Sequence, residues 1–176
     1  GVYDQIERIP TAPVDRDPDH VAANPLSKVP TLVLDDGTQR VELLHFGHAH
    51  TAGDAIAWLP KLGIAFTGDA CVNGAFNYTG DSNTASWIGV LTEMKKLPIK
   101  TIAPGHGEMS DASLIDTQRR YFVELRQFVQ KALDDGKSLE QIKESIDLPF
   151  YEKWTGVDVK ERVENIEHVY GELTAQ

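Results

Sequence analysis

The chain has 176 residues, 41% of them hydrophobic and 25% charged, which is an ordinary balance for one globular domain with a hydrophobic core. Its formal net charge of -10 argues against a nucleic-acid partner, because phosphate contacts need a basic surface. No apolar run is long enough for a transmembrane helix, and a single cysteine, Cys71, excludes an internal disulfide. We therefore expect a soluble protein without a membrane partner, and the periplasm is one candidate compartment.

The first 30 residues predict an extended lead-in rather than a packed element. They contain five of the nine prolines, at positions 10, 13, 18, 25 and 30. The chain also begins with Gly1 and not with methionine, which is typical of an internal fragment or a processed end.

Strands are predicted next. Residues 31–46 form two apolar runs around Asp36-Gly37, a strong hairpin signal. Residues 55–69 repeat this design around a Pro-Lys-Leu-Gly turn, and residues 100–107 predict a short strand that runs into a Pro-Gly break. Each predicted strand region leads to a loop that contains histidine or aspartate.

Helices are predicted for most of the remaining chain. Apolar residues at helical spacing predict a helix over residues 84–97 and a longer one from Leu114 to Leu133, which Gly136 ends. A capping box of Ser138 and Gln141 opens a short helix, and apolar residues from 159 to 173 predict a last one. This order favours a layered α/β fold with polar loops gathered at one edge of the sheet.

Three loops carry residues that could bind a metal. His50, Asp69 and His106 each follow a predicted strand, so a stiff scaffold would hold all three side chains. We expect Thr51 and Asp54 to hydrogen-bond within the first loop and to orient its imidazole. Each residue alone is equally well explained as an ordinary turn residue. Together, two imidazoles and a carboxylate suggest part of a zinc or dinuclear site.

The order of these motifs resembles the C-terminal half of the metallo-β-lactamase superfamily. A Gly-x-x-His-Thr-x-Gly-Asp motif ends at Asp54, a Phe-Thr-Gly-Asp motif ends at Asp69, and a Pro-Gly-His-Gly motif surrounds His106. The resemblance runs from about residue 28 to the end of the chain and is nearest to zinc metallohydrolases related to sulfur-oxidation and quinoprotein-relay proteins. It implies half of an αββα sandwich, with a mixed or antiparallel sheet and flanking helices.

The resemblance also implies a ligand set and a missing segment. His50 would bind one metal, Asp69 would bridge two metals, and His106 would bind the second; one or two zinc ions are expected, with iron or manganese as alternatives. The family's first motif, His-x-His-x-Asp-His, is absent, because Ala52 and Gly53 stand where its aspartate and histidine would be. We therefore expect residues 1–30 to lead from a missing N-terminal half and residues 31–176 to form the C-terminal half. The apolar sheet face left open would then pair with a second copy or with the missing half.

The implied function is metal-dependent hydrolysis of a small molecule. A metal-bound hydroxide would attack a carbonyl ester, thioester, lactone or β-lactam amide, and Asn73, Phe76 and Asn77 would line a substrate loop. Trp87 is better explained as a core residue. We expect weak or absent activity from this chain alone. Two alternatives stay open, namely a non-catalytic scaffold or interaction domain that has lost its metals, and a diiron redox member of the same superfamily.

Overall fold

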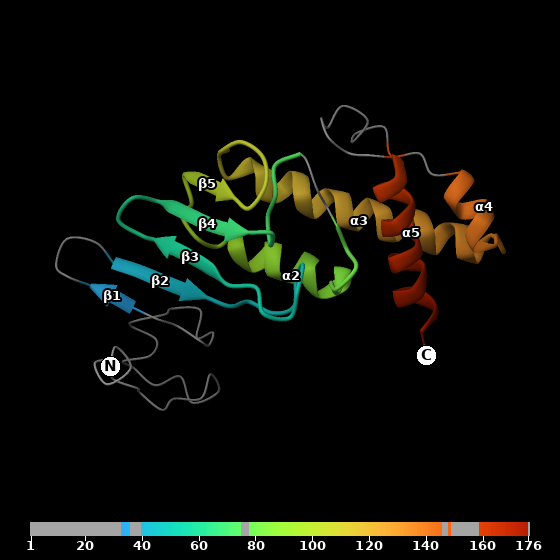
Figure 1. Ribbon diagram of the computed structural model, residues 1–176, viewed down its shortest axis with the longest axis horizontal. Coiled ribbons are helices and arrows are strands. Elements are labelled where there is room, and N and C mark those ends of the chain that lie inside the picture. Colours follow the sequence, from blue (N-terminus) through green and yellow to red (C-terminus); the bar gives the residue numbers. More distant parts are fainter. Residues whose placement is uncertain (1–32, 36–39, 75–77, 146–147, 149–158, 176) are drawn as a thin grey trace.

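A computed structural model describes residues 33–35, 40–74, 78–145, 148 and 159–175 (Figure 1). Within these residues four strands come first, followed by one helix, a fifth strand and three further helices. The elements are β1 (Val33–Asp35), β2 (Arg40–Leu44), β3 (Ile56–Leu59), β4 (Ile64–Gly68), α2 (Thr84–Met94), β5 (Thr101–Pro104), α3 (Ser113–Asp134), α4 (Leu139–Glu144) and α5 (Val159–Thr174). The predicted domain boundary at residue 30 lies outside the described residues and stays a prediction.

The strands form one mixed sheet in the order β1-β2-β3-β4-β5. Neighbouring strands from β1 to β4 are antiparallel, whereas β4 and β5 are parallel and are connected through α2. It follows that β2, β4 and β5 all run in the same direction. Their carboxyl ends therefore lie at one edge of the sheet, as the sequence predicts, and the mixed sheet with flanking helices confirms the predicted fold class.

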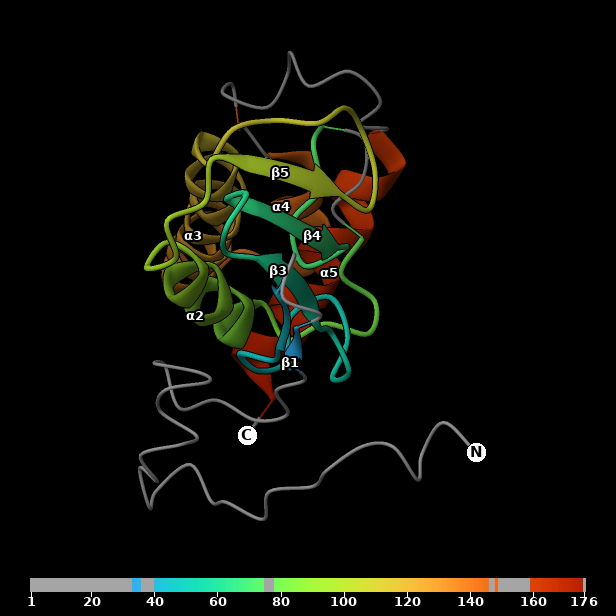
Figure 2. The ribbon, with the colours of Figure 1, turned by 90° about the vertical axis from the view of Figure 1, so that its left-hand side faces the viewer.

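One face of the sheet forms the hydrophobic core with α2 and α3, which lie side by side on it (Figure 2). Side chains alternate between buried and more exposed along β3 and β4, as expected for a strand with one face in the core. The buried side chains on this face include Leu44, Ile56, Trp58, Ala65 and Ile102. Helix α3 extends beyond the sheet, where α5 packs against it and α4 packs against α5 (Figure 1).

The opposite face of the sheet carries a second apolar row. Leu43, Ala57, Phe66 and Ala103 are register partners across four strands, and the side chain of Phe66 is 48% exposed. Figure 2 shows that α2 and α3 lie on the other face, and Figure 1 shows that α4 and α5 lie beyond the end of the sheet. We call these four residues the outer row.

The helix termini match the signals in the sequence. Asn83 caps α2 by accepting a hydrogen bond from the backbone N–H of Ser86 at 2.8 Å. Both hydrogen bonds of the predicted capping box between Ser138 and Gln141 are present at the start of α4. Gly136, with φ of 76°, follows the end of α3. No helix in the described part of the chain is long and apolar enough to cross a membrane.

Candidate metal centre

The three predicted ligands lie in loops that leave the same edge of the sheet. Asp69 follows β4 directly, His106 follows β5 by two residues, and His50 lies in the loop after β2. Strands β4 and β5 are neighbours, at a spacing of about 4.8 Å, whereas β3 separates β2 from β4, a distance of about 10 Å between strand axes. The topology therefore places Asp69 and His106 next to each other. His50 starts from a strand farther away and could approach them only through its loop.

Asp69 and His106 are in direct contact. The Nδ1 atom of His106 lies 2.8 Å from the Oδ1 atom of Asp69, and the two side chains are 52% and 30% exposed. An ionised carboxylate can only accept a hydrogen bond, so Nδ1 is the protonated nitrogen in this contact. In the neutral ring, Nε2 then carries the lone pair that a metal ion requires.

The glycines on both sides of His106 allow this close approach. A Cβ atom at Gly105 would lie 2.1 Å from the Oδ1 atom of Asp69, and the Gly105 N–H donates to the carbonyl oxygen of Gly68 at 2.9 Å. A Cβ atom at Gly107 would lie 1.9 Å from the carbonyl oxygen of Asn73, and Gly107 has φ of 84°. The Gly-His-Gly sequence is thus explained by close neighbours at both glycines, which leave no room for a side chain.

Asn73, which the sequence assigns to a substrate loop, holds the His106 loop in place. Its backbone N–H donates to the carbonyl oxygen of His106 at 2.9 Å, and its side-chain Nδ2 donates to the carbonyl oxygen of Glu108 at 2.7 Å. The other two residues of that predicted loop, Phe76 and Asn77, lie outside the described residues. Asn73 therefore has a structural role that spacing alone did not indicate.

The loop after Asp69 is anchored to the helices beneath it. The Trp87 indole N–H donates to the carbonyl oxygen of Ala70 at 2.8 Å, and Gln118 of α3 accepts from the backbone N–H of Val72 at 3.2 Å. Trp87 is 1% exposed and packs against the tilted ring of Phe122, with ring centroids 4.3 Å apart, which confirms its assignment to the core. Burial raises the pKa of the Cys71 thiol to about 12, so this cysteine stays protonated at neutral pH.

His50 lies against aromatic rings. Its ring centroid is 5.8 Å from that of Trp87, in an edge-on arrangement, and 6.1 Å from that of Tyr78. Within the described ranges, no three side chains of histidine, cysteine, aspartate or glutamate gather closely enough to hold a metal ion. The structure thus brings together two of the three predicted ligands and leaves His50 outside the pair.

The loop that carries His50 has its own hydrogen bonds. The side chain of Asp54 accepts from the backbone N–H of Thr51 at 2.9 Å and from the Thr51 hydroxyl at 3.1 Å, as expected for a loop-closing pair. The carbonyl oxygen of Asp54 accepts from Nδ1 of His45 at 2.7 Å, so the imidazole that Asp54 orients is that of His45. The Nε2 atom of His48 donates to the carbonyl oxygen of Asp81 at 2.7 Å, which ties this loop to the segment before α2.

Solved structures with a similar fold were found among known hydrolases. A metallo-beta-lactamase from Pontibacter korlensis is 24% identical, with a TM-score of 0.50, over 53% of this chain and 46% of that chain. The stereoselective inverting sec-alkylsulfatase Pisa1 from Pseudomonas sp. is 16% identical, with a TM-score of 0.67, over 84% of this chain and 26% of that chain. VMB-1 is 27% identical, with a TM-score of 0.48, over 55% of this chain and 46% of its own.

The metallo-beta-lactamase from Pontibacter korlensis and the alkylsulfatase share the fold of this chain, but each is a longer protein. It spans about half the length of the metallo-beta-lactamase from Pontibacter korlensis and about a quarter of the length of the alkylsulfatase. Sequence comparison assigns residues 12–106 to the Metallo-beta-lactamase superfamily, a match that covers more than half of the chain and includes all three predicted ligands. The chain belongs to the metallo-beta-lactamase superfamily.

Proposed function

We propose that this chain carries the C-terminal metal ligands of a metal-dependent hydrolase. The observation that carries the proposal is the 2.8 Å contact between Asp69 and His106 at the carboxyl ends of two neighbouring parallel strands. Membership of the superfamily supports the hydrolase class. Asp69 and His106 would hold the metal, and His50 would be the third ligand from this chain.

The donor types in the contact fit zinc, because imidazole nitrogen and carboxylate oxygen are both ordinary zinc ligands. A catalytic zinc needs three protein ligands, so the Asp69–His106 pair accounts for only part of a site. We propose that His50 and residues from outside this chain complete the ligand set. The chemistry that a bound zinc ion supplies is activation of water near neutral pH and polarisation of the bond to be cleaved.

The residues of this chain would contribute by fixing ligand geometry. Asp69 accepts a hydrogen bond from the Nδ1–H of His106 and so selects the tautomer whose Nε2 carries the lone pair. Asn73 holds the backbone on both sides of Gly107, which limits the movement of the His106 ring. We propose a small-molecule substrate with a carbonyl ester, thioester, lactone or β-lactam amide, bound near Asn73, Phe76 and Asn77.

Metal analysis of the purified full-length protein tests this proposal. We expect stoichiometric zinc in the wild-type protein, and a loss of at least about tenfold in zinc affinity in His106→Ala and Asp69→Asn, since each removes a ligand. His45→Asn is the matched control, because the amide nitrogen of asparagine can replace Nδ1 of His45 as the donor to Asp54. The same samples are then assayed with an ester, a thioester, a lactone, a β-lactam and a secondary alkyl sulfate.

The result also separates the alternatives. A wild-type protein that holds no stoichiometric metal would refute the hydrolase and support a scaffold that has lost its metals. Stoichiometric iron together with oxygen or nitric oxide reduction, and without hydrolysis of any of these compounds, would support the diiron redox alternative.

A further inference from the structure

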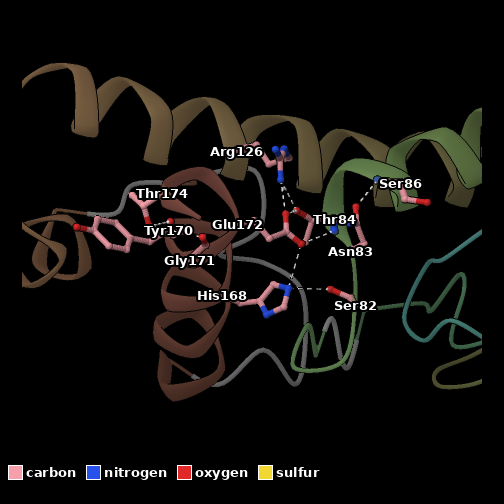
Figure 3. A network of polar contacts seen from close by, with 10 residues as sticks. All are labelled: Ser82, Asn83, Thr84, Ser86, Arg126, His168, Tyr170, Gly171, Glu172 and Thr174. Carbon is pink, nitrogen blue, oxygen red and sulfur yellow. Dashed lines mark hydrogen bonds and ion pairs between the residues drawn. The ribbon is translucent and has the colours of Figure 1, made fainter. Parts of the chain in front are cut away.

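The C-terminal helix α5 makes a polar junction with the start of α2 that the proposed site does not include. The carboxylate of Glu172 accepts from the backbone N–H of Thr84 at 2.7 Å, and it also accepts from the Thr84 hydroxyl and from Arg126 of α3 (Figure 3). The Nε2 atom of His168 lies 3.0 Å from Glu172 and 3.4 Å from the Ser82 hydroxyl. Arg126 completes the junction by donating to the Thr84 hydroxyl at 2.7 Å.

A second set of hydrogen bonds, inside the core, joins α5 to Thr79 in the segment before α2. The Thr79 hydroxyl donates to Oδ1 of Asn165 at 2.8 Å, and Nδ2 of Asn165 donates to the Tyr121 hydroxyl at 2.7 Å. All three side chains are at least 97% buried. A buried polar group left without its partner costs about 1–3 kcal/mol, so these bonds specify one position of α5 against residues 79–84.

Residues 78–84 in turn contact the loop that carries His50. The carbonyl oxygen of Asp81 accepts from His48, and the backbone N–H of Asn83 donates to the carbonyl oxygen of Ala49 at 3.2 Å. The ring of Tyr78 lies beside that of His50. We call residues 78–84 the bridging segment, because it contacts α5 on one side and residues 48–50 on the other.

We propose that α5 positions His50 through the bridging segment, so that Asn165, His168 and Glu172 are positioning residues for the candidate metal centre. The metal part of this inference rests on the proposed function, whereas the positioning of His50 does not. His50 stands outside the Asp69–His106 pair, and its loop is linked to the rest of the fold by hydrogen bonds to the bridging segment. We expect loosening of α5 to act on the His50 loop, which the bridging segment contacts directly, more than on the contact between Asp69 and His106.

The test compares two variants on the same helix in the full-length protein. Glu172→Gln removes the charge that Arg126 and the start of α2 bind, whereas Glu167→Gln removes an exposed carboxylate whose partner, Lys143 of α4, lies away from the bridging segment. The first readout is metal-free and consists of the imidazole nitrogen chemical shifts of His50 and the amide hydrogen exchange of residues 48–50. The second is zinc affinity, measured by competition with a coloured chelator.

We expect Glu172→Gln to shift the His50 resonances, to speed amide exchange at residues 48–50 at least tenfold and to weaken zinc binding about tenfold, the lower end for losing a group that orients a ligand. Glu167→Gln should match the wild type in all three. Thr84→Val, which removes the hydroxyl bound to Glu172, should repeat the effect, and Thr84→Ser should restore wild-type behaviour. Rescue by serine separates this role from a general loss of stability.

Two outcomes would overturn the inference. One is an unchanged His50 spectrum and unchanged exchange at residues 48–50 in a folded Glu172→Gln protein. The other is an equal response of the His106 resonances, which would mean that α5 stabilises the whole edge of the sheet. If the wild-type protein binds no zinc, the proposed function fails, but the metal-free readout still decides whether α5 positions His50.

Discussion

Gly105 has no side chain, and this allows it to pack closely against Asp69 and Gly68 at the candidate metal centre. Its backbone N–H donates to Gly68, at the end of the neighbouring strand, and the space beside its Cα is filled by the Oδ1 atom of Asp69. A methyl group there would meet both a carboxylate oxygen and the backbone carbon of Gly68 at 2.7 Å. Backbone cannot move aside as a flexible side chain can, so any residue other than glycine at this position requires the loop to shift.

We therefore predict that Gly105→Ala destabilises the protein by about 1–3 kcal/mol, the usual cost of forcing an extra carbon into a packed region. It should also break the contact between Asp69 and His106. Urea denaturation measures the change in free energy of unfolding. Gly53→Ala is the control, because nothing lies within 4 Å of the added methyl group. Equal stability of the two variants would show that the loop can relax around the new side chain.

Among the secondary-structure elements, α5 is attached to α2 and α3 by a partly buried carboxylate. Burial by itself would raise the pKa of Glu172, but the hydrogen bonds from Thr84 and the charges of Arg126 and His168 outweigh it and lower the pKa below its ordinary value of 4.5. The folded protein therefore binds this proton less readily than the unfolded chain does. The interaction contributes stability above pH 4.5 and loses it as the pH falls towards the lower folded-state pKa.

This linkage predicts how Glu172→Gln changes acid unfolding. The free energy of unfolding of the variant should fall below that of the wild type at neutral pH, and the difference should shrink as the pH falls below about 4.5, where the unfolded carboxylate takes up a proton. Urea titrations followed by circular dichroism at several pH values measure this difference in the free energy of unfolding. A difference that stays constant from pH 7 to pH 3 would contradict the assignment.

At the scale of the whole molecule, the outer row is an apolar surface of the kind that packs against another protein segment. Leu43, Ala57, Phe66 and Ala103 form an apolar row on the sheet face opposite α2 and α3, and Phe66 is about half exposed. Apolar rows of this kind are typical of surfaces that bind another part of the protein or another copy. We propose that in the 176-residue chain a second copy packs against this face, and that in the full-length protein its N-terminal half does so.

We predict that Phe66→Asp weakens self-association of the 176-residue chain by at least about tenfold, because burying a phenylalanine side chain contributes about 1.5–3 kcal/mol. Sedimentation velocity over a concentration series measures the association. Leu62→Asp is a matched control, since Leu62 is 46% exposed but lies in the turn between β3 and β4. A wild-type chain that stays monomeric at every concentration would refute self-association.

The sequence by itself determined the elements and the loops that carry candidate ligands. The period of apolar residues predicts α2, α3 and α5, the turn residues predict the β1–β2 and β3–β4 hairpins, and the capping box predicts the start of α4. These signals depend on residues only a few positions apart, so a short stretch of sequence is enough to detect each of them. The order of the three motifs was likewise sufficient to identify the superfamily.

Only the tertiary structure decided which of these residues meet. Asp69 and His106 are 37 residues apart and touch because β5 pairs with β4, whereas β3 lies between β4 and the strand that leads to the His50 loop. Thr84 and Glu172 are 88 residues apart, and no periodic pattern predicts their contact. Such contacts depend on strand order and on how helices dock, and these follow from packing across the whole core rather than from any short stretch of sequence.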